Sequence, residues 1–229
     1  RGSTCAALNC QRVVVNGTLR LTLMVPTNLL CMHMAPANEN CETRPAIARE
    51  IIAVKDAHGW HHIDLTCLPA IYHNYPERIE GAVRDAVAKH ASEYDAIYIG
   101  YADCGTGGGL QAACDEVGVE MIAGPHCYSF FEGNNAFAAR DEMTAFYLTD
   151  FLVRQFDAFV WKPLGLDRHP DLRDMYFGHY ETLVYQAQTD DPQLTKIAKD
   201  CADRLGLTFE RRYTGYGDLA QHLKSWAAI

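Results

Sequence analysis

Residues 96–123, with the sequence AIYIGYADCGTGGGLQAACDEVGVEMIA, decide the fold. They begin with a short apolar run, Ala96–Gly100, which is typical of a buried strand. A glycine-rich turn follows, then a helical pattern over Leu110–Val117 and a second apolar run over Val119–Ala123. Strand, helix and strand within about thirty residues indicate a βαβ unit, in which the two strands are parallel.

The same alternation extends in both directions from this stretch. Helices are predicted after Pro45 and Pro76 and over Pro192–Leu205, and strands over Ile63–Leu68, Thr182–Gln186 and Thr208–Tyr213. We therefore predict an α/β fold, a mostly parallel sheet with helices on both faces and Rossmann-like or flavodoxin-like layers.

Three further segments carry specific expectations. Tyr147–Phe156 has an amphipathic helical pattern, with Thr144 or Thr149 as its cap, and Phe159–Trp161 reads as a strand. Before residue 45 the pattern is irregular, although Leu19–Val25 could be a strand beside an Asn16-Gly17 turn. We divide the chain into an irregular segment, residues 1–44, and an α/β domain, residues 45–229.

Composition excludes several classes of function. The chain has 229 residues, 48% of them hydrophobic, and a net charge of −9, which argues against nucleic acid or an anionic membrane surface as a partner. No apolar run approaches the roughly 18 residues of a membrane span. The nine cysteines are an odd number without dense pairing, which favours reduced thiols and a cytoplasmic protein.

The first candidate site is the turn after Ala96–Gly100. Cys104 follows Asp103 at a strand end, and Gly105 and Gly107 lie in the turn before the helix. A cysteine at a helix N-terminus has a lowered pKa, which suits a metal ligand or a nucleophile, and we expect the glycine amides to face a ligand. The alternative is a flexible turn with a buried cysteine.

A second cluster, His126-Cys127, follows the strand predicted at Val119–Ala123. Adjacent side chains point in different directions, so one would ligate a metal or react while the other orients it. His73 also follows a predicted strand, and we expect it at the same sheet edge, although a loop histidine is more often a surface residue.

A third charged loop contains Asp167 and Arg168 before His169. These two side chains could pair with each other, or they could bind a carboxylate or phosphate of a small-molecule substrate or cofactor.

Together these motifs resemble one family. The run from about Ala46 to the C-terminus is similar to the domain-of-unknown-function family numbered 1638. The matching stretches are Ala48–Ile51, Leu68-Pro69, His73-Asn74, Pro76–Ile79, Tyr101–Gly107, Gly124–Tyr128, Phe146–Leu152, Gly165–Pro170 and Tyr213–Gly217. The resemblance implies a bound metal on Cys104, His126 and Cys127. It implies that the loop of Asp167 and Arg168 lies on the same rim as the two cysteine clusters. It also implies a link to corrinoid-dependent one-carbon metabolism, with a corrinoid protein or methyltransferase as partner.

This chain departs from the family pattern at one position. The family usually has a Cys-Gly pair before the Ala48–Ile51 segment, where this chain has Arg44-Pro45. The nearest cysteine is Cys41, which would have to replace the missing ligand.

Three hypotheses follow from the sequence. In the first, Cys104 and Cys127 hold a divalent metal, with His126 as ligand or base and His73 and Asp103 as further catalytic candidates. Zinc suits thiolate and imidazole best, with iron or an iron–sulfur cluster behind it. In the second, the protein is a non-catalytic accessory that handles a metal or corrinoid. In the third, it is a metal-free enzyme with Cys104 as nucleophile.

Overall fold

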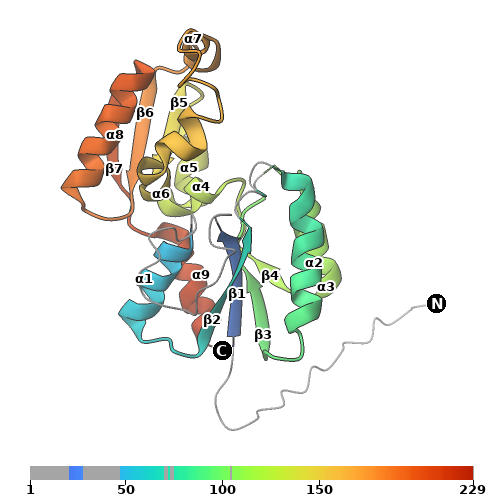
Figure 1. Ribbon diagram of the computed structural model, residues 1–229. Coiled ribbons are helices and arrows are strands. Elements are labelled where there is room, and N and C mark those ends of the chain that lie inside the picture. The colour runs from blue at the N-terminus through green and yellow to red at the C-terminus, as the bar shows by residue number, and fades with distance from the viewer. Residues whose placement is uncertain (1–20, 28–46, 70–71, 73–74, 104, 229) are drawn as a thin grey trace.

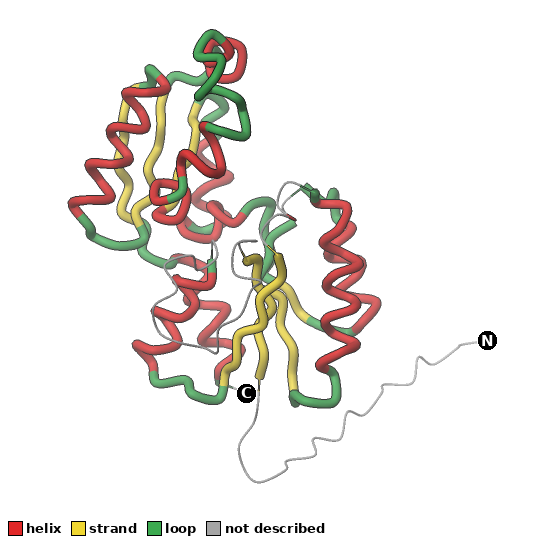
Figure 2. Tube along the Cα trace, in the orientation of Figure 1, coloured by secondary structure: helices red, strands yellow, loops and turns green. Residues whose placement is uncertain are grey.

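The computed structural model describes residues 21–27, 47–69, 72, 75–103 and 105–228. Its strands form two separate parallel sheets, which Figures 1 and 2 show one above the other. The predicted α/β class is confirmed, because the sheets are parallel and helices lie on both sides of them.

The first sheet has four strands in the order β2-β1-β3-β4. Their bounds are β1 (Leu21–Thr27), β2 (Ile63–Pro69), β3 (Ala96–Ile99) and β4 (Glu120–Met121). In the register of β1, Leu23 lies opposite Leu65 of β2 and Tyr98 of β3. Residues before position 45 thus contribute an inner strand to this sheet.

The second sheet has three strands in the order β5-β6-β7. Their bounds are β5 (Ala145–Thr149), β6 (Thr182–Ala187) and β7 (Thr208–Tyr213). Within the described residues, helices connect and cover both sheets: α1 (Ala48–His58), α2 (Ile79–His90), α3 (Gly109–Val117), α4 (Cys127–Glu132), α5 (Asn134–Arg140), α6 (Asp150–Arg154), α7 (Leu172–Phe177), α8 (Pro192–Leu205) and α9 (Gly217–Ala227). A 3₁₀ turn at Pro76–Arg78 precedes α2, and a π-helical turn lies at Asp157–Trp161.

The two faces of the first sheet have separate apolar cores. Successive strand residues point to opposite faces, so Tyr98 and Ile99 of β3 belong to different cores. Tyr98 packs with Ile51 of α1 and Leu223 of α9, whereas Ile99 packs in the core formed with α2 and α3. This two-sided cover explains why β3 reads as a continuous apolar run.

The second sheet has its own core on the side of α6 and α8. Leu183, Tyr185 and Ala187 of β6 are fully buried there, with Ala198 of α8 among their neighbours. The alternate residue Gln186 is on the opposite face, where it donates to Glu132 of α4 at 3.1 Å. We call the β1–β4 sheet with α1, α2, α3 and α9 the first unit, and the β5–β7 sheet with α6, α7 and α8 the second unit.

Helix α9 follows β7 of the second unit but packs in the core of the first (Figure 1). The Trp226 ring stacks on Tyr98 with centroids 4.5 Å apart, and its indole N–H donates to Glu120 at 2.8 Å. The chain therefore passes between the units twice, and its last helix completes the first core.

Two local predictions are wrong. The helix predicted over Tyr147–Phe156 is β5 followed by α6, because residues 145–149 pair with β6. The strand predicted at Phe159–Trp161 lies in the π-helical turn. The predicted cap is confirmed, since the Thr149 hydroxyl accepts from the amide of Leu152 at 3.4 Å.

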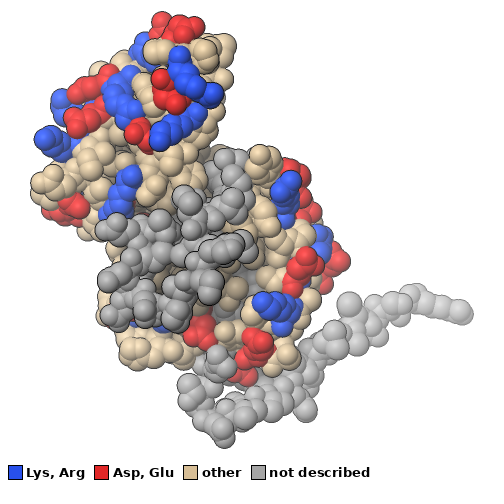
Figure 3. Space-filling view, viewed as in Figure 1, with Lys and Arg blue, Asp and Glu red and all other residues tan. Residues whose placement is uncertain are grey.

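None of the helices in the described ranges combines the length and apolar character needed to cross a membrane. On the face in view in Figure 3, the drawn Lys and Arg side chains are interspersed with Asp and Glu. Mixed charge of this kind is typical of an ordinary solvated surface.

Gly217 sits where β7 passes into α9, and a side chain there has no room. Its φ is +44°, and an added Cβ would lie 2.2 Å from the carbonyl oxygen of Phe130 and 2.3 Å from that of Phe131. We expect Gly217→Ala to lower the free energy of unfolding by about 2 to 4 kcal/mol, because backbone atoms must move. Urea unfolding followed by circular dichroism measures this change.

Gly81→Ala is the matched control for this substitution. Gly81 lies on the exposed side of α2 with nothing within 4 Å of an added Cβ, so alanine there should be neutral or stabilising by up to about 1 kcal/mol. Equal stability of the two variants would contradict the close approach of α4 to residue 217.

Candidate functional site

The carboxyl ends of the strands in both sheets face each other across the junction of the two units (Figure 1). In the first sheet, β1 connects through α1 to β2 on one side, and β3 connects through α3 to β4 on the other. This reversal of strand order lies between β1 and β3, and ligands of such sheets bind at that point. The loop after β3 is therefore the first part of the candidate site.

The Asp103 carboxylate organises that loop. It accepts the Thr106 hydroxyl at 2.7 Å, the Gly108 amide at 2.7 Å and the Gly107 amide at 3.1 Å. These hydrogen bonds, that of Thr106 first, hold the pKa of Asp103 below its usual value. The side chain acts as an acceptor for the turn that begins α3.

This arrangement changes the role expected of the glycines. From the sequence, the amides of Gly105 and Gly107 are expected to face a ligand, whereas the Gly107 amide donates to Asp103 at 3.1 Å, and the Gly105 backbone also contributes to the lowered pKa of Asp103. Their positive φ angles, +86° and +63°, are the reason for glycine at these positions. The cofactor-binding role of Gly105 and Gly107 and the catalytic role of Asp103 stay predictions.

The two cysteine-bearing loops lie side by side. The Asp103 amide donates to the carbonyl of Gly124 at 3.0 Å, which joins the loop after β3 to the loop after β4. Gly124 also lies against α4 and α5, since an added Cβ would lie 2.6 Å from Asn134 Oδ1 and 2.8 Å from the Phe130 ring. The predicted proximity of the two loops is confirmed for their described residues, and Cys104 lies outside them.

His126 and Cys127 begin α4 with different surroundings. His126 is extended, its carbonyl accepts the Ser129 hydroxyl at 2.7 Å, and its exposed ring stacks on Tyr128 with centroids 4.9 Å apart. Cys127 is half-buried and packs against the first core. As expected for neighbouring residues, the two side chains do not share one environment.

The loop of Asp167 and Arg168 is not brought to this edge. It precedes α7, where Arg173 donates to the carbonyl of Leu205 at 2.6 Å, immediately before β7 starts. Figure 1 shows α7 at the outer tip of the second unit, at the ends where its strands begin. Asp167 and Arg168 pair with each other at 3.8 Å, which is the structural alternative.

Other predicted residues cannot be placed. His73, Cys104 and Cys41 lie outside the described residues. In the described ranges, the structure contains no group of three or more His, Cys, Asp or Glu side chains that could hold a metal ion.

Sequence reasoning missed a buried carboxyl at the junction. Glu50, in the first turn of α1, is 4% exposed, and its Oε2 has no hydrogen-bond partner within the described part of the chain. Burial is the main cause that raises the pKa of Glu50 to about 7, and the Asp150 carboxylate acts in the same direction. Arg154 and Arg49 oppose them.

Asp150, at the carboxyl end of β5, is by contrast fully bonded. It accepts the Tyr185 hydroxyl at 2.7 Å, the Gln188 amide at 3.0 Å, and the Thr189 hydroxyl at 2.5 Å and amide at 3.2 Å. Arg154 lies 3.6 Å away. Charge-assisted hydrogen bonds of this kind stabilise a carboxylate at the end of the second sheet.

Tyr216 completes this group from the segment before α9. Its pKa is raised by burial and then by the carboxylates of Glu50 and Asp150. Glu50, Asp150, Arg154 and Tyr216 thus come from both units, and we call them the junction cluster. A carboxyl that titrates near neutral pH is suited to proton transfer.

A signal for Asp150 was present in the sequence. Asp103 was predicted because polar residues follow a strand there, and Asp150 likewise follows β5 directly. The wrong helix prediction over Tyr147–Phe156 concealed that relation. Glu50 has no comparable signal, because burial of a single charged residue in a helix is not visible in the pattern.

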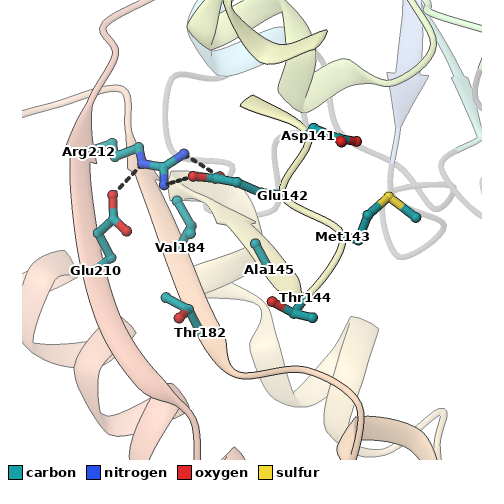
Figure 4. A pocket seen from close by; sticks show the side chains of 9 residues that line it. All are labelled: Asp141, Glu142, Met143, Thr144, Ala145, Thr182, Val184, Glu210 and Arg212. Carbon is teal, nitrogen blue, oxygen red and sulfur yellow. Dashed lines mark hydrogen bonds and ion pairs between the residues drawn. The ribbon is translucent and has the colours of Figure 1, made fainter. Parts of the chain in front are cut away.

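A pocket of about 280 Å³ lies on the second sheet, beside the starts of β5 and β6 (Figure 4). Arg212 lines it and is bound by Glu142 at 2.6 and 2.7 Å and also by Glu210. Arg212, and then the Tyr147 hydroxyl, lower the pKa of Glu142 to about 2. This ion network is already satisfied, and Arg212 extends it to Glu132 of α4 at 3.8 Å.

Glu50 makes stability depend on pH. The pKa of Glu50 in the folded protein, about 7, exceeds its ordinary value of 4.5. The stability that the protonated Glu50 carboxyl contributes is therefore fully present below about pH 4.5 and is lost as pH rises through about 7. We expect Glu50→Gln, which cannot ionise, to exceed the wild type in unfolding free energy above pH 7 by roughly 3 kcal/mol, because the pKa of Glu50 is raised from 4.5 to about 7. Urea unfolding at several pH values measures it.

Glu77→Gln provides the control, because Glu77 is exposed in the turn before α2. Its stability difference from the wild type should stay constant with pH. A pH-independent difference for Glu50→Gln would contradict an elevated pKa at residue 50.

Comparison with known proteins supplies one match. The family described as "Protein of unknown function (DUF1638)" matches residues 67–223. This range covers more than half of the chain and contains Asp103, His126, Asp150 and Tyr216, while Glu50 precedes it. The search of curated proteins gave no match. The chain therefore belongs to the DUF1638 family of proteins of unknown function.

Proposed function

We propose that this protein binds a divalent metal ion at the carboxyl edge of its first sheet, through Cys104 and Cys127 with His126 as ligand or base. The hydrogen bond from the Asp103 amide to the Gly124 carbonyl, 3.0 Å, carries the proposal. Cys104 follows Asp103 directly, and His126-Cys127 comes two residues after Gly124. The bond therefore joins the two loops that bear these candidate ligands.

The chemistry of the donors fits zinc. Thiolate sulfur and imidazole nitrogen are its usual protein ligands, and iron or an iron–sulfur cluster accepts the same set. The described residues do not complete a site by themselves, so the proposal depends on Cys104, and His73 and Cys41 are further candidates. Bound there, a metal would supply Lewis-acid activation of a thiol, water or methyl donor.

The described residues have distinct parts in this proposal. Asp103 holds the glycine turn through Thr106 and Gly108, so it positions the loop rather than contacting a ligand. His126 presents an exposed ring beside Tyr128 and is available as ligand or proton acceptor. Cys127 lies deeper, against the first core.

The reaction class rests on the resemblance described above. It favours methyl or other one-carbon transfer with a small-molecule substrate and a corrinoid protein or methyltransferase as partner. A non-catalytic role in handling a metal or corrinoid is the alternative, and it would use the same ligands.

Metal analysis of the purified protein tests the site. We expect about one zinc or iron per chain in the wild type and at least a tenfold loss in the Cys104→Ser/Cys127→Ser double variant, because both thiolates are removed. Inductively coupled plasma mass spectrometry gives the content. Cys201→Ala is the control, since Cys201 is buried in the core of the second unit.

Full metal content in the folded double variant would exclude this site. Metal-free wild-type protein after metal-supplemented expression would favour the thiol enzyme with Cys104 as nucleophile. Turnover with methyl-corrinoid or methylamine donors would then separate an enzyme from an accessory protein.

A further inference from the structure

The two chain passages between the units lie next to each other. One passage is at Gly133, between Phe131 of the first core and Phe137 of α5. The ring centroid of Phe137 lies 5.1 Å from that of Tyr147 of β5. The other runs from the end of β7 to Asp218 at the start of α9. They are tied together, because the Asn134 amide donates to Asp218 at 2.8 Å. Because the two passages are adjacent, the units can rotate relative to each other at one place, which we call the pivot.

Both passages contain glycine in conformations that other residues rarely adopt. Gly133 has φ +93° and Gly215 has φ +57°, and an added Cβ at Gly215 would meet nothing within 4 Å. Hinges of this kind absorb a rotation in a few backbone angles. Glu132 binds Gln186 and Arg212 of the second unit and directly precedes Gly133. A rotation about Gly133 would displace these contacts least, because they lie next to the axis.

Away from the pivot, the units meet through the junction cluster. Glu50 lies in the first turn of α1, and Asp150 begins α6 directly after β5, so both helix starts lie at the facing edges of the two sheets (Figure 1). The charges of Asp150, Arg154 and Arg49 act on Glu50, and those of Glu50 and Asp150 act on Tyr216. Asp150 is 1% exposed and already bonded by Tyr185, Gln188 and Thr189. Glu50 Oε2 is buried with no partner in the described residues. Two carboxyls are therefore buried at the edges where the units meet, and one of them, Glu50, has an oxygen without a partner in the described residues.

We propose that Glu50 is a proton-operated latch between the two units, which holds the junction closed when its carboxyl is protonated and releases it when ionised.

The physical cause is the cost of a second buried charge. Ionised Glu50 would be removed from water and repelled by Asp150. Arg154, which attracts it, lies 3.6 Å from Asp150 as well, and Arg49 on α1 also attracts it. A rotation about Gly133 and Gly215 returns the carboxylate to solvent and removes that cost. The raised pKa, about 7, places the change near neutral pH, with the closed form favoured at lower pH.

Opening would uncover the facing carboxyl ends of both sheets, including the loops after β3 and β4 of the first sheet (Figure 1). The latch thus controls access to the edge at which ligands of such sheets bind. It rests on Glu50, the pivot and the junction, and holds whether or not a metal binds.

Small-angle X-ray scattering of the full chain at about pH 5 and about pH 8 tests the latch, since these values bracket the pKa of Glu50. We expect the wild type to have a larger radius of gyration at the higher pH. Glu50→Gln, which cannot ionise, should stay compact at both, and Glu77→Gln should follow the wild type. Glu50→Met is a second uncharged variant if Glu50→Gln does not fold.

Hydrogen exchange gives an independent measure. After correction for the intrinsic pH dependence, exchange of peptides covering residues 47–54 and 148–156 should rise by roughly 50- to 100-fold over this range in the wild type. A peptide from α2, residues 79–90, should not change. The uncharged variants should lose the increase.

Two results would overturn the latch. The first is a wild type whose radius and corrected exchange are the same at both pH values. The second is an uncharged variant that opens as the wild type does, which would assign the pH response to another group.

Discussion

The return of α9 to the first unit is the contact on which the rest of the structure depends. Leu219, Leu223 and Trp226 pack with Ile51 of α1 and Tyr98 of β3, so the core on this face of the first sheet is built from both ends of the chain. Without α9 these side chains would lose their apolar cover, which is a main source of folding free energy. The second unit is therefore inserted between two parts of the first, and the units cannot be separated by a single cut.

The sequence predicts the fold well where patterns are local. The apolar runs of residues 96–123 and the intervening glycines identify β3, α3 and the site edge, because both periodicity and turn chemistry are read within a few residues. Whether strands join one sheet or two depends on pairing between distant residues, such as Leu23 with Tyr98. A single sequence contains no direct information on that pairing.

The site was predictable to a similar extent. The predicted ends of two strands indicated Asp103 and the loop at His126 as parts of the site. The hydrogen bond between Asp103 and Gly124 joins these two loops. Asp150 was hidden because Tyr147–Thr149 is apolar enough for a helix or a strand, and only its pairing with β6 decides. Glu50 needed the full packing of both units, since its properties come from burial and from charges on α6.

The set of donors around Asp150 has a consequence for substitution at that position. Two backbone amides and two hydroxyl groups point their hydrogens at its two oxygens. Asparagine has nearly the same shape, but its NH₂ group would present hydrogens to hydrogens in a buried place. Position 150 therefore requires a side chain whose two terminal atoms both accept hydrogen bonds. This requirement concerns the direction of the hydrogen bonds rather than the size or charge of the side chain.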